Sequence, residues 1–172
     1  MVQISAKSDY ALRALCHLAG QDGEAAVKAE EIATAQGIPR SFLDGILLDL
    51  RRAGIVTSRR GPVGGHRLAR PAYAVTIADV IRVMEGPLAL VHGNRPEELG
   101  YAGPATHLQD VWVALRAAVR GVLESTTLEQ VVTGALPEGV SRLNGDARSW
   151  VSVWPPRPPR PAPADRPILA DG

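Results

Sequence analysis

Thiol chemistry is nearly missing from this chain, because Cys16 is the only cysteine among its 172 residues. A single thiol cannot form a disulfide within the chain, and one subunit cannot supply a cluster of thiolate ligands. Apolar runs are also short, and none approaches the roughly 18–20 residues that cross a bilayer. The first residues lack the basic and apolar regions of a secretory signal. We therefore expect a cytoplasmic protein without membrane contact.

Net charge is low as well, but the charge is unevenly placed. The chain carries a formal net charge of only +1. The segment 37–70 contains seven arginines and only two acids, Asp44 and Asp49, which is an excess of five positive charges. Local clustering of positive charge, rather than a basic chain overall, is typical of nucleic-acid binding. The composition, 45% hydrophobic and 22% charged, indicates a globular protein.

Signatures of catalysis are also missing. The glycine-rich segment 61–65 lacks the lysine and hydroxyl of a phosphate-binding loop, and it precedes an expected strand rather than a helix. The four histidines and one cysteine are scattered, so no pairing of nucleophile and base can be identified. We therefore predict that the chain is not an enzyme.

The first half of the chain has the pattern of a helix-turn-helix. Residues 8–20 predict a first helix that Ser8 or Asp9 caps. Residues 29–36 predict a short second helix, and residues 39–53 a third. The break between the last two is Gly-Ile-Pro, and a short glycine-containing turn between two helices is typical of this motif. Helical spacing in the third helix predicts a buried stripe: Phe42, Leu43, Ile46, Leu47 and Leu50.

Two short extended runs follow, at 55–59 and 66–70, around a Gly/Pro cluster. This arrangement predicts a β-hairpin, the wing of a winged helix. A further helix over 76–85, capped by Thr76, completes the predicted winged helix-turn-helix domain of residues 1–90.

Beyond this domain we expect a connecting loop at 91–106 and then a region of short elements over 107–144. The latter begins with the longest amphipathic helix, 107–124. A helix with one strongly apolar side, placed beyond a DNA-binding unit, typically pairs with its symmetry mate, although packing within its own subunit remains open. Residues 145–172 contain seven prolines and predict a flexible tail. The predicted fold class is therefore mainly α with a small β-hairpin, a winged helix-turn-helix domain and a long C-terminal dimerisation helix.

Several short motifs stand in a fixed order over roughly residues 1–135. They are Asp9-Tyr10-Ala11-Leu12, Glu31-Ile32-Ala33, Ile38-Pro39-x-x-Phe42-Leu43, Leu50-x-x-Ala53-Gly54-Ile55-Val56, Ser58-x-Arg60-Gly61-Pro62-x-Gly64-Gly65, Thr76-Ile77-x-Asp79-Val80-Ile81 and Glu85-Gly86. The ordered set resembles the Rrf-two (Rrf2) family of winged-helix transcription regulators, which includes iron–sulfur and nitric-oxide-sensitive members. The resemblance implies a homodimer with crossed long helices that binds a pseudo-palindromic operator in double-stranded DNA.

The start of the third helix is the first candidate contact with DNA. Its N-terminal residues would reach base edges in the major groove, where Arg40 can donate to guanine or phosphate and Asp44 can accept from cytosine. The resemblance implies that Ser41 and Asp44 lie at base-reading positions. Alternatively, Arg40 and Asp44, four residues apart, pair with each other on the helix surface.

The wing is the second candidate contact. The resemblance implies that Arg60 enters the minor groove, where narrow A·T tracts concentrate negative potential. We expect its glycines to let backbone amides approach phosphates. His66 stands where relatives carry tyrosine. The complete predicted set of DNA-binding residues is Arg40, Ser41, Asp44, Arg51, Arg59, Arg60, Gly61, Gly64, Gly65 and His66.

The loop at 92–107 has no cysteine, whereas the resemblance implies three there in members that hold an iron–sulfur cluster. His92, His107, Glu97 and Glu98 would suit a harder metal, but histidines in a polar loop are more often solvated. Cys16 lies among apolar residues and is expected in the core rather than as a redox sensor. Asp9 is expected to cap a helix rather than to bind a cluster.

We therefore predict a DNA-binding repressor without cofactor or metal, signalled by a small molecule or a protein. The alternative is a winged-helix module that binds proteins and has no specific affinity for DNA. Leu48, Asp49 and the proline-rich tail favour this alternative.

Overall fold

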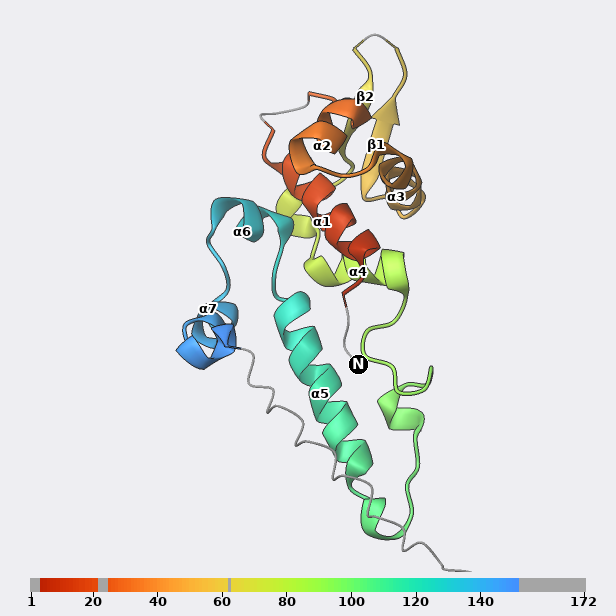
Figure 1. The fold of residues 1–172 in the computed structure, drawn as a ribbon, viewed down its shortest axis with the longest axis vertical. Coiled ribbons are helices and arrows are strands. Elements are labelled where there is room, and N and C mark those ends of the chain that lie inside the picture. The colour runs from red at the N-terminus through yellow and green to blue at the C-terminus, as the bar shows by residue number, and fades with distance from the viewer. Residues whose placement is uncertain (1–3, 22–24, 62, 152–172) are drawn as a thin grey trace, which may run out of the picture.

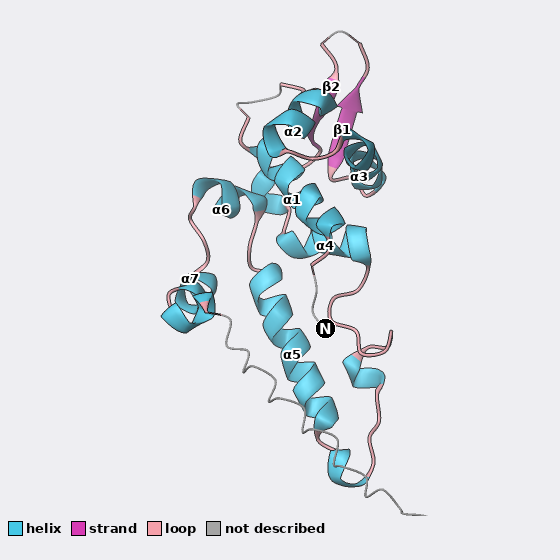
Figure 2. Ribbon diagram, viewed as in Figure 1, coloured by secondary structure: helices cyan, strands magenta, loops and turns pink. Residues whose placement is uncertain are grey.

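The fold is known from a computed structural model that describes residues 4–21, 25–61 and 63–151 (Figure 1). Seven helices lie within this part of the chain: α1 (Ala6–Ala19), α2 (Ala29–Gln36), α3 (Arg40–Arg52), α4 (Ile77–Glu85), α5 (Leu108–Leu123), α6 (Leu128–Thr133) and α7 (Glu138–Asn144). Two strands, β1 (Val56–Arg59) and β2 (Gly65–Leu68), pair antiparallel. Four single 3-10 turns complete it: η1 (Ala72–Ala74), η2 (Pro96–Glu98), η3 (Gly103–Ala105) and η4 (Ala147–Trp150). The mainly helical fold with one small hairpin confirms the predicted class (Figure 2).

Helix α1 begins earlier than the sequence predicted, so its expected cap is wrong. The cap is Ser5, whose hydroxyl accepts a hydrogen bond from the backbone N–H of Ser8 at 3.2 Å. Ser8 is fully buried within the helix and donates its own hydroxyl proton to Glu85 at the end of α4. The two serines therefore join the start of α1 to the end of α4.

The turn between α2 and α3 follows the prediction closely. Gly37 adopts a left-handed conformation (φ +59°), which glycine tolerates best, and ends α2. Pro39 lies at the cap position just before α3 rather than inside its first turn. Lys28 stands at the cap position of α2 and provides no side-chain cap.

The core lies where α1, α2 and α3 meet. Its buried residues include Leu15, Ile32, Leu43, Ile46 and Leu50. Phe42 was expected among them but is 61% exposed, so this prediction is wrong. Since successive helical residues stand about 100° apart, Phe42 lies on the edge of the buried face of α3. There its ring meets Tyr10 of α1 edge-on, with centroids 6.4 Å apart.

The hairpin is attached to the chain segment that precedes α2. Strand β2 pairs with β1 in the register Ser58 to His66. On its other side, His66 exchanges two backbone hydrogen bonds with Val27, at 2.7 and 2.9 Å. This third extended segment fixes the base of the wing beside α3. We call α1–α4 with the hairpin the winged-helix unit.

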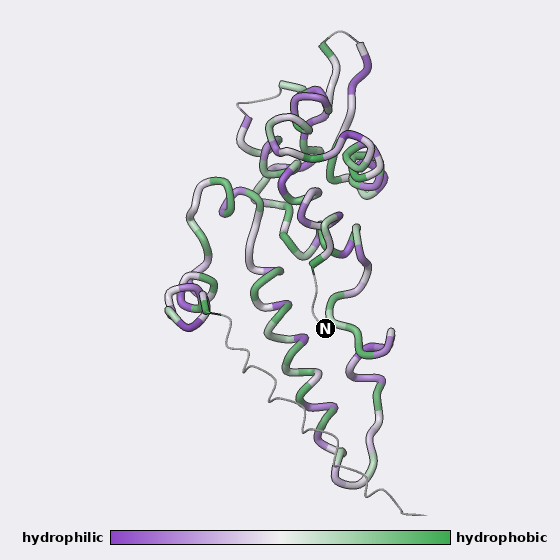
Figure 3. Tube along the Cα trace, viewed as in Figure 1, coloured by the Kyte–Doolittle hydropathy of each residue, from purple (hydrophilic) through white to green (hydrophobic). Residues whose placement is uncertain are grey.

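Helix α5 extends away from the winged-helix unit, with the 86–107 connection beside it (Figure 1). None of its 16 residues is buried. Apolar residues nevertheless recur along its length (Figure 3). Four of them are clearly exposed: Leu108, Val111, Val113 and Leu115. Leu108, Val111 and Leu115, at i, i+3 and i+7, therefore form an uncovered apolar face, and Val113 lies on the opposite side of the helix.

After α5 the chain returns to the winged-helix unit. Leu128 of α6 is fully buried in the core, and its N–H donates to Val75 O at 3.0 Å. Ile77 N donates to Thr126 O at 2.9 Å, which ties the start of α4 to the end of α5. The sequence indicated short elements here but not that one of them closes the core.

We expected a flexible tail to begin at residue 145. The first residues of this tail instead form a turn, because η4 occupies 147–150. The remainder of the tail, 152–172, lies outside the described residues. No helix in the described part of the chain combines the length and apolarity needed to cross a bilayer.

Candidate nucleic-acid interface

The outward side of α3 is formed by residues spaced at i, i+4, i+7 and i+11. Ser41, Gly45 and Arg52 are exposed there, and Leu48 is half-buried. Opposite them, Leu43, Ile46, Leu47 and Leu50 fix the helix on the core. The burial of one face therefore determines which residues α3 presents to a ligand. The sequence had not singled out Gly45 as part of this side.

The edge of α3 that faces the wing carries paired charges. Arg40 contacts Asp44 at 2.7 Å and Glu30 of α2 at 3.5 Å. The arginine is therefore held by two carboxylates, which is the surface pairing that the sequence left open. Further along, Arg51 donates to the hydroxyl of Ser58 in β1 at 3.3 Å. The structure brings these predicted residues together between α3 and the hairpin.

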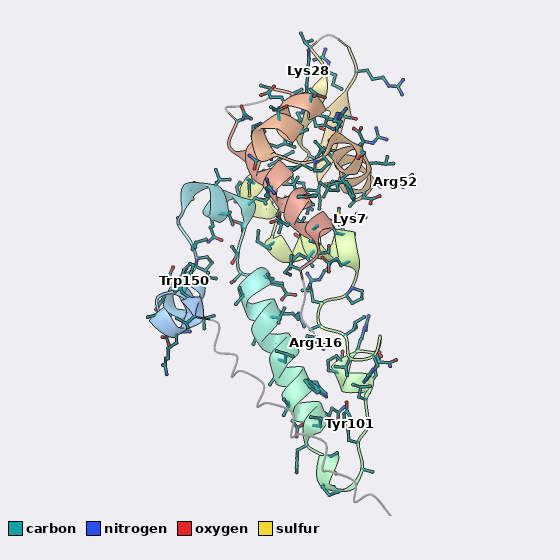
Figure 4. All side chains as sticks on the ribbon, viewed as in Figure 1. Lys7, Lys28, Arg52, Tyr101, Arg116 and Trp150 are labelled. Carbon is teal, nitrogen blue, oxygen red and sulfur yellow. The ribbon has the colours of Figure 1, made fainter. Side chains whose placement is uncertain are left out.

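The other edge of α3 faces α1, and it accounts for Asp49. Lys7 of α1 contacts the Asp49 carboxylate at 2.8 Å, and Arg52 lies 3.8 Å from it. The hydrogen bond and charge of Lys7 lower the pKa of Asp49. Figure 4 shows Lys7 and Arg52 on this side of the unit. Asp49 is therefore neutralised by a neighbouring helix and does not offset the arginines of the wing.

The wing places Arg59 and Arg60 at its exposed end. Neither guanidinium forms an ion pair with any residue of the described ranges. Arg67, on the other strand, donates to Thr57 at 3.4 Å. Together the cations make one exposed basic surface, which consists of Arg40, Arg51, Arg52, Arg59 and Arg60.

Two of the three wing glycines are required by the protein's own packing. A Cβ on Gly64 would lie 2.3 Å from the carbonyl oxygen of Arg59, and one on Gly65 would lie 2.5 Å from that of Val27. The packing of the wing therefore already requires glycine at both positions, and their approach to phosphates stays a prediction. Gly61 is different, because it is exposed, has φ +113° and has open space around its Cβ position.

His66 lies at the base of the wing, next to α3. Its Nδ1 is buried, and no described residue bonds to it. Burial lowers the pKa of His66, and the charges of Arg40 and Arg51 lower it further, while Asp44 opposes them. The ring is therefore held in its neutral form beside the basic surface.

The 91–106 connection does not suit an iron–sulfur cluster. It contains no thiol. Cys16 is half-buried on α1, and burial raises its pKa, which disfavours the thiolate that binds metal. Glu97 instead contacts Arg116 at 2.6 Å, and His107 contacts Asp110 at 3.1 Å. Among the residues the structure describes, no group of three metal-binding side chains is brought together.

A family profile matches residues 4–134, and its description is Rrf2, iron-dependent transcriptional regulator. A chain named as an HTH-type transcriptional regulator, Rv1287 of Mycobacterium tuberculosis, is 49% identical over 152 residues, which are 88% of this chain and 94% of the relative. CymR of Bacillus subtilis is 36% identical over 132 residues, covering 77% and 91%. These relatives are named as regulators, not enzymes.

Solved structures agree with the sequence comparison. The structure of CymR, the global cysteine regulator of B. subtilis, matches 78% of this chain and 98% of its own, with a TM-score of 0.68 and 36% identity. The IscR of T. potens matches 77% and 88%, with a TM-score of 0.63 and 32% identity. The likeness therefore spans the winged-helix unit and the long helix beyond it.

Proposed function

The chain belongs to the Rrf2 family of DNA-binding transcription regulators, and from this premise we propose that it represses genes as a homodimer on a pseudo-palindromic operator. One observation carries the proposal: α3 and the adjacent wing present exposed arginines. Duplex DNA presents closely spaced phosphates, and neutralising them supplies much of the binding free energy. A regulator of this kind works on the chromosome, so we place it in the cytoplasm.

In this proposal, α3 lies in the major groove with Ser41 and Asp44 at base edges. Arg40 contacts only Oδ1 of Asp44, so the other carboxylate oxygen can accept from cytosine N4 while Arg40 reaches toward a phosphate or guanine. Arg51 would contact the backbone beside the groove. In the free protein Arg40 pairs with Asp44, an exposed contact weak enough for a duplex to replace.

The wing would follow the adjacent minor groove. Arg60 would enter it, and Arg59 would contact a flanking phosphate. The open space around Gly61 leaves its backbone amide accessible to a phosphate oxygen. Gly64, Gly65 and His66 would act by holding this shape, since their contacts are with the hairpin and Val27.

The second subunit would join through α5. A helix of 16 residues with no buried side chain gains apolar burial when it pairs with its own copy, and this gain has to exceed the entropy cost of association. Two-fold pairing would also place two wings on one side, as a two-fold operator requires. The dimer is the unit that we expect to bind DNA.

The side chains of this chain do not fit an iron–sulfur cluster, because Cys16 is its only thiol. The signal is instead proposed to be a small molecule or a protein partner. The alternative function is a protein-binding module, which Leu48, Asp49 and the proline-rich tail favoured. Asp49 is occupied by Lys7 and no longer favours it, whereas Leu48 is half-buried and residues 152–172 of the tail lie outside the described residues.

The first test measures affinity for genomic fragments by fluorescence anisotropy. Arg60→Ala is expected to weaken operator binding about tenfold or more, most strongly where the flanks are rich in A·T. Arg59→Ala should reduce the slope of log affinity against log salt by ~0.9, the value for one phosphate contact. Arg142→Ala, an exposed arginine of α7, is the matched control and should change neither. Affinity that stays at the non-specific level for every fragment would contradict the proposal and favour the alternative.

A further inference from the structure

Four arginines that the DNA interface does not use converge between α4, α5 and the connection that joins them. They line a pocket of about 230 Å³: Arg82 of α4, Arg95 of the connection, and Arg116 and Arg120 of α5. Pro87, Leu88 and Leu90 form its apolar part, and Glu97 is its acidic residue. Figure 4 labels Arg116, on α5 and well below the wing. The pocket and the basic surface are therefore separate.

Acidic side chains only partly balance these arginines. Glu124 accepts from Arg120 at 2.9 Å and also from Arg82, while Glu97 contacts Arg116 at 2.6 Å. Arg95 forms no ion pair with a residue of the described part of the chain. Glu98 also lies close, since its carboxylate accepts from the Arg95 backbone N–H at 3.3 Å, so four guanidinium groups and three carboxylates leave an excess of one positive charge. Bringing like charges together in this way is unfavourable unless an anion joins them.

The chemistry of the group matches an oxyanion. A guanidinium presents a planar fork of donors that fits carboxylate and phosphate oxygens, and several forks around one pocket favour a ligand with more than one such group. The pocket is small, and its apolar part is short. We infer that it binds a small anionic metabolite with at least two oxyanion groups, either carboxylates or phosphates.

The position of the pocket gives such a ligand a regulatory role, which rests on the proposed function. Arg82 belongs to the winged-helix unit, whereas Glu124 belongs to the helix of the proposed dimer. An anion that binds these arginines would compete with Glu124 and Glu97 and release both carboxylates from their ion pairs. The angle between α4 and α5, and therefore the spacing of two wings in a dimer, would change with occupancy.

Thermal unfolding tests binding without any DNA. The probes are inorganic pyrophosphate and citrate, each with more than one oxyanion group, added at constant protein concentration and constant ionic strength. At ten times its Kd, a bound probe should raise Tm by roughly 3–6 °C. The variant is Arg95→Gln, which removes a cation without breaking an ion pair in the described residues, and the matched control is Arg142→Gln.

The site is supported if a probe raises the Tm of the wild type and of Arg142→Gln, and raises that of Arg95→Gln by at most half as much. The probe with the lower Kd tells a phosphate from a carboxylate ligand. Equal shifts in all three proteins would reflect general exclusion of the anion from protein surfaces and would overturn the inference. No shift with either probe would overturn it as well.

The regulatory role is measured separately as operator affinity with and without saturating probe. We expect a change of about fivefold or more, lost in Arg95→Gln. Unchanged affinity with a bound probe would overturn the effector role and leave DNA binding itself intact. Absence of any operator affinity would instead contradict the proposed function, while the thermal shift could still be measured.

Discussion

In the proposed complex, single residues on the outward side of α3 would determine how closely this helix can approach a duplex. Gly45 is exposed in the middle of the helix, and a Cβ built on it meets no atom within 4 Å. Glycine weakens a helix interior, so its presence here has a stability cost that packing does not explain. A bare backbone at this point would let base edges come near the helix.

Gly45→Ala should therefore separate stability from function. We expect the free energy of unfolding to rise by about 1 kcal/mol, because alanine favours the helix. Operator affinity should fall, because the added methyl group would stand between α3 and the groove. Urea unfolding and anisotropy measure the two effects. Gly139→Ala in α7 is the control, since it also has open space and should leave DNA binding unchanged. Affinity that rises or stays equal in Gly45→Ala would refute the close approach.

His66 gives a prediction on pH. Its pKa is lowered in the folded protein, chiefly by burial, so the unfolded chain takes up the proton at a higher pH. The stabilisation from its neutral form is complete above the unfolded pKa of 6.5 and decreases as the pH falls below that value.

His66→Gln should consequently flatten the decline in stability between about pH 7.5 and 5.5. Urea midpoints at several pH values measure this decline. His92→Gln, which replaces an exposed histidine of the connection that forms no ion pair in the described residues, serves as the control. An identical slope in His66→Gln would show that the ring is not responsible.

Elements were predictable where local chemistry decides them. Gly37 ends α2, Thr76 caps α4 with its hydroxyl and Asp79, and the hairpin surrounds a Gly/Pro cluster, all signals that a sequence carries. Long-range contacts were not predictable. The Ser5 cap depends on Glu85, 80 residues away, and Phe42 is exposed because it lies at the edge of the buried face of α3.

In the candidate site, too, local features were predictable and long-range contacts were not. Charge clustering indicated which arginines are exposed, and the structure places them around α3 and the wing. The partnership of Asp49 with Lys7 and the packing of Gly65 on Val27 join distant segments, so no local pattern could predict them. The two helices after α5 were expected only as short elements, because neither has a long apolar period.

The wing's attachment to Val27 can be tested as an element. Gly65→Ala should destabilise the protein by about 1–3 kcal/mol, because its Cβ would overlap the Val27 backbone. Gly100→Ala, in the connection, has open space and is the control. Urea unfolding compares them. Equal stability of the two variants would mean that β2 can move away from Val27 at no cost.

At the scale of the whole molecule, α5 should hold two subunits together. Leu115 is 42% exposed on α5 and apolar. Leu115→Asp should convert the dimer to a monomer, because an unpaired carboxylate would be buried in the interface. Val131→Asp on α6, at a site 41% exposed, is the matched control and should remain dimeric. Sedimentation velocity measures the mass. A wild-type chain that sediments as a monomer would refute the pairing.

The central claim is that two copies of the basic surface meet one duplex together. Sequencing the genomic fragments captured by the purified protein measures this most directly. We predict enrichment of a pseudo-palindrome whose half-sites are separated by about one or two helical turns, roughly 10 or 21 base pairs. The Arg60→Ala variant should enrich this pseudo-palindrome less than the wild type does. Fragments without a common motif, or with a single unrepeated half-site, would contradict the account.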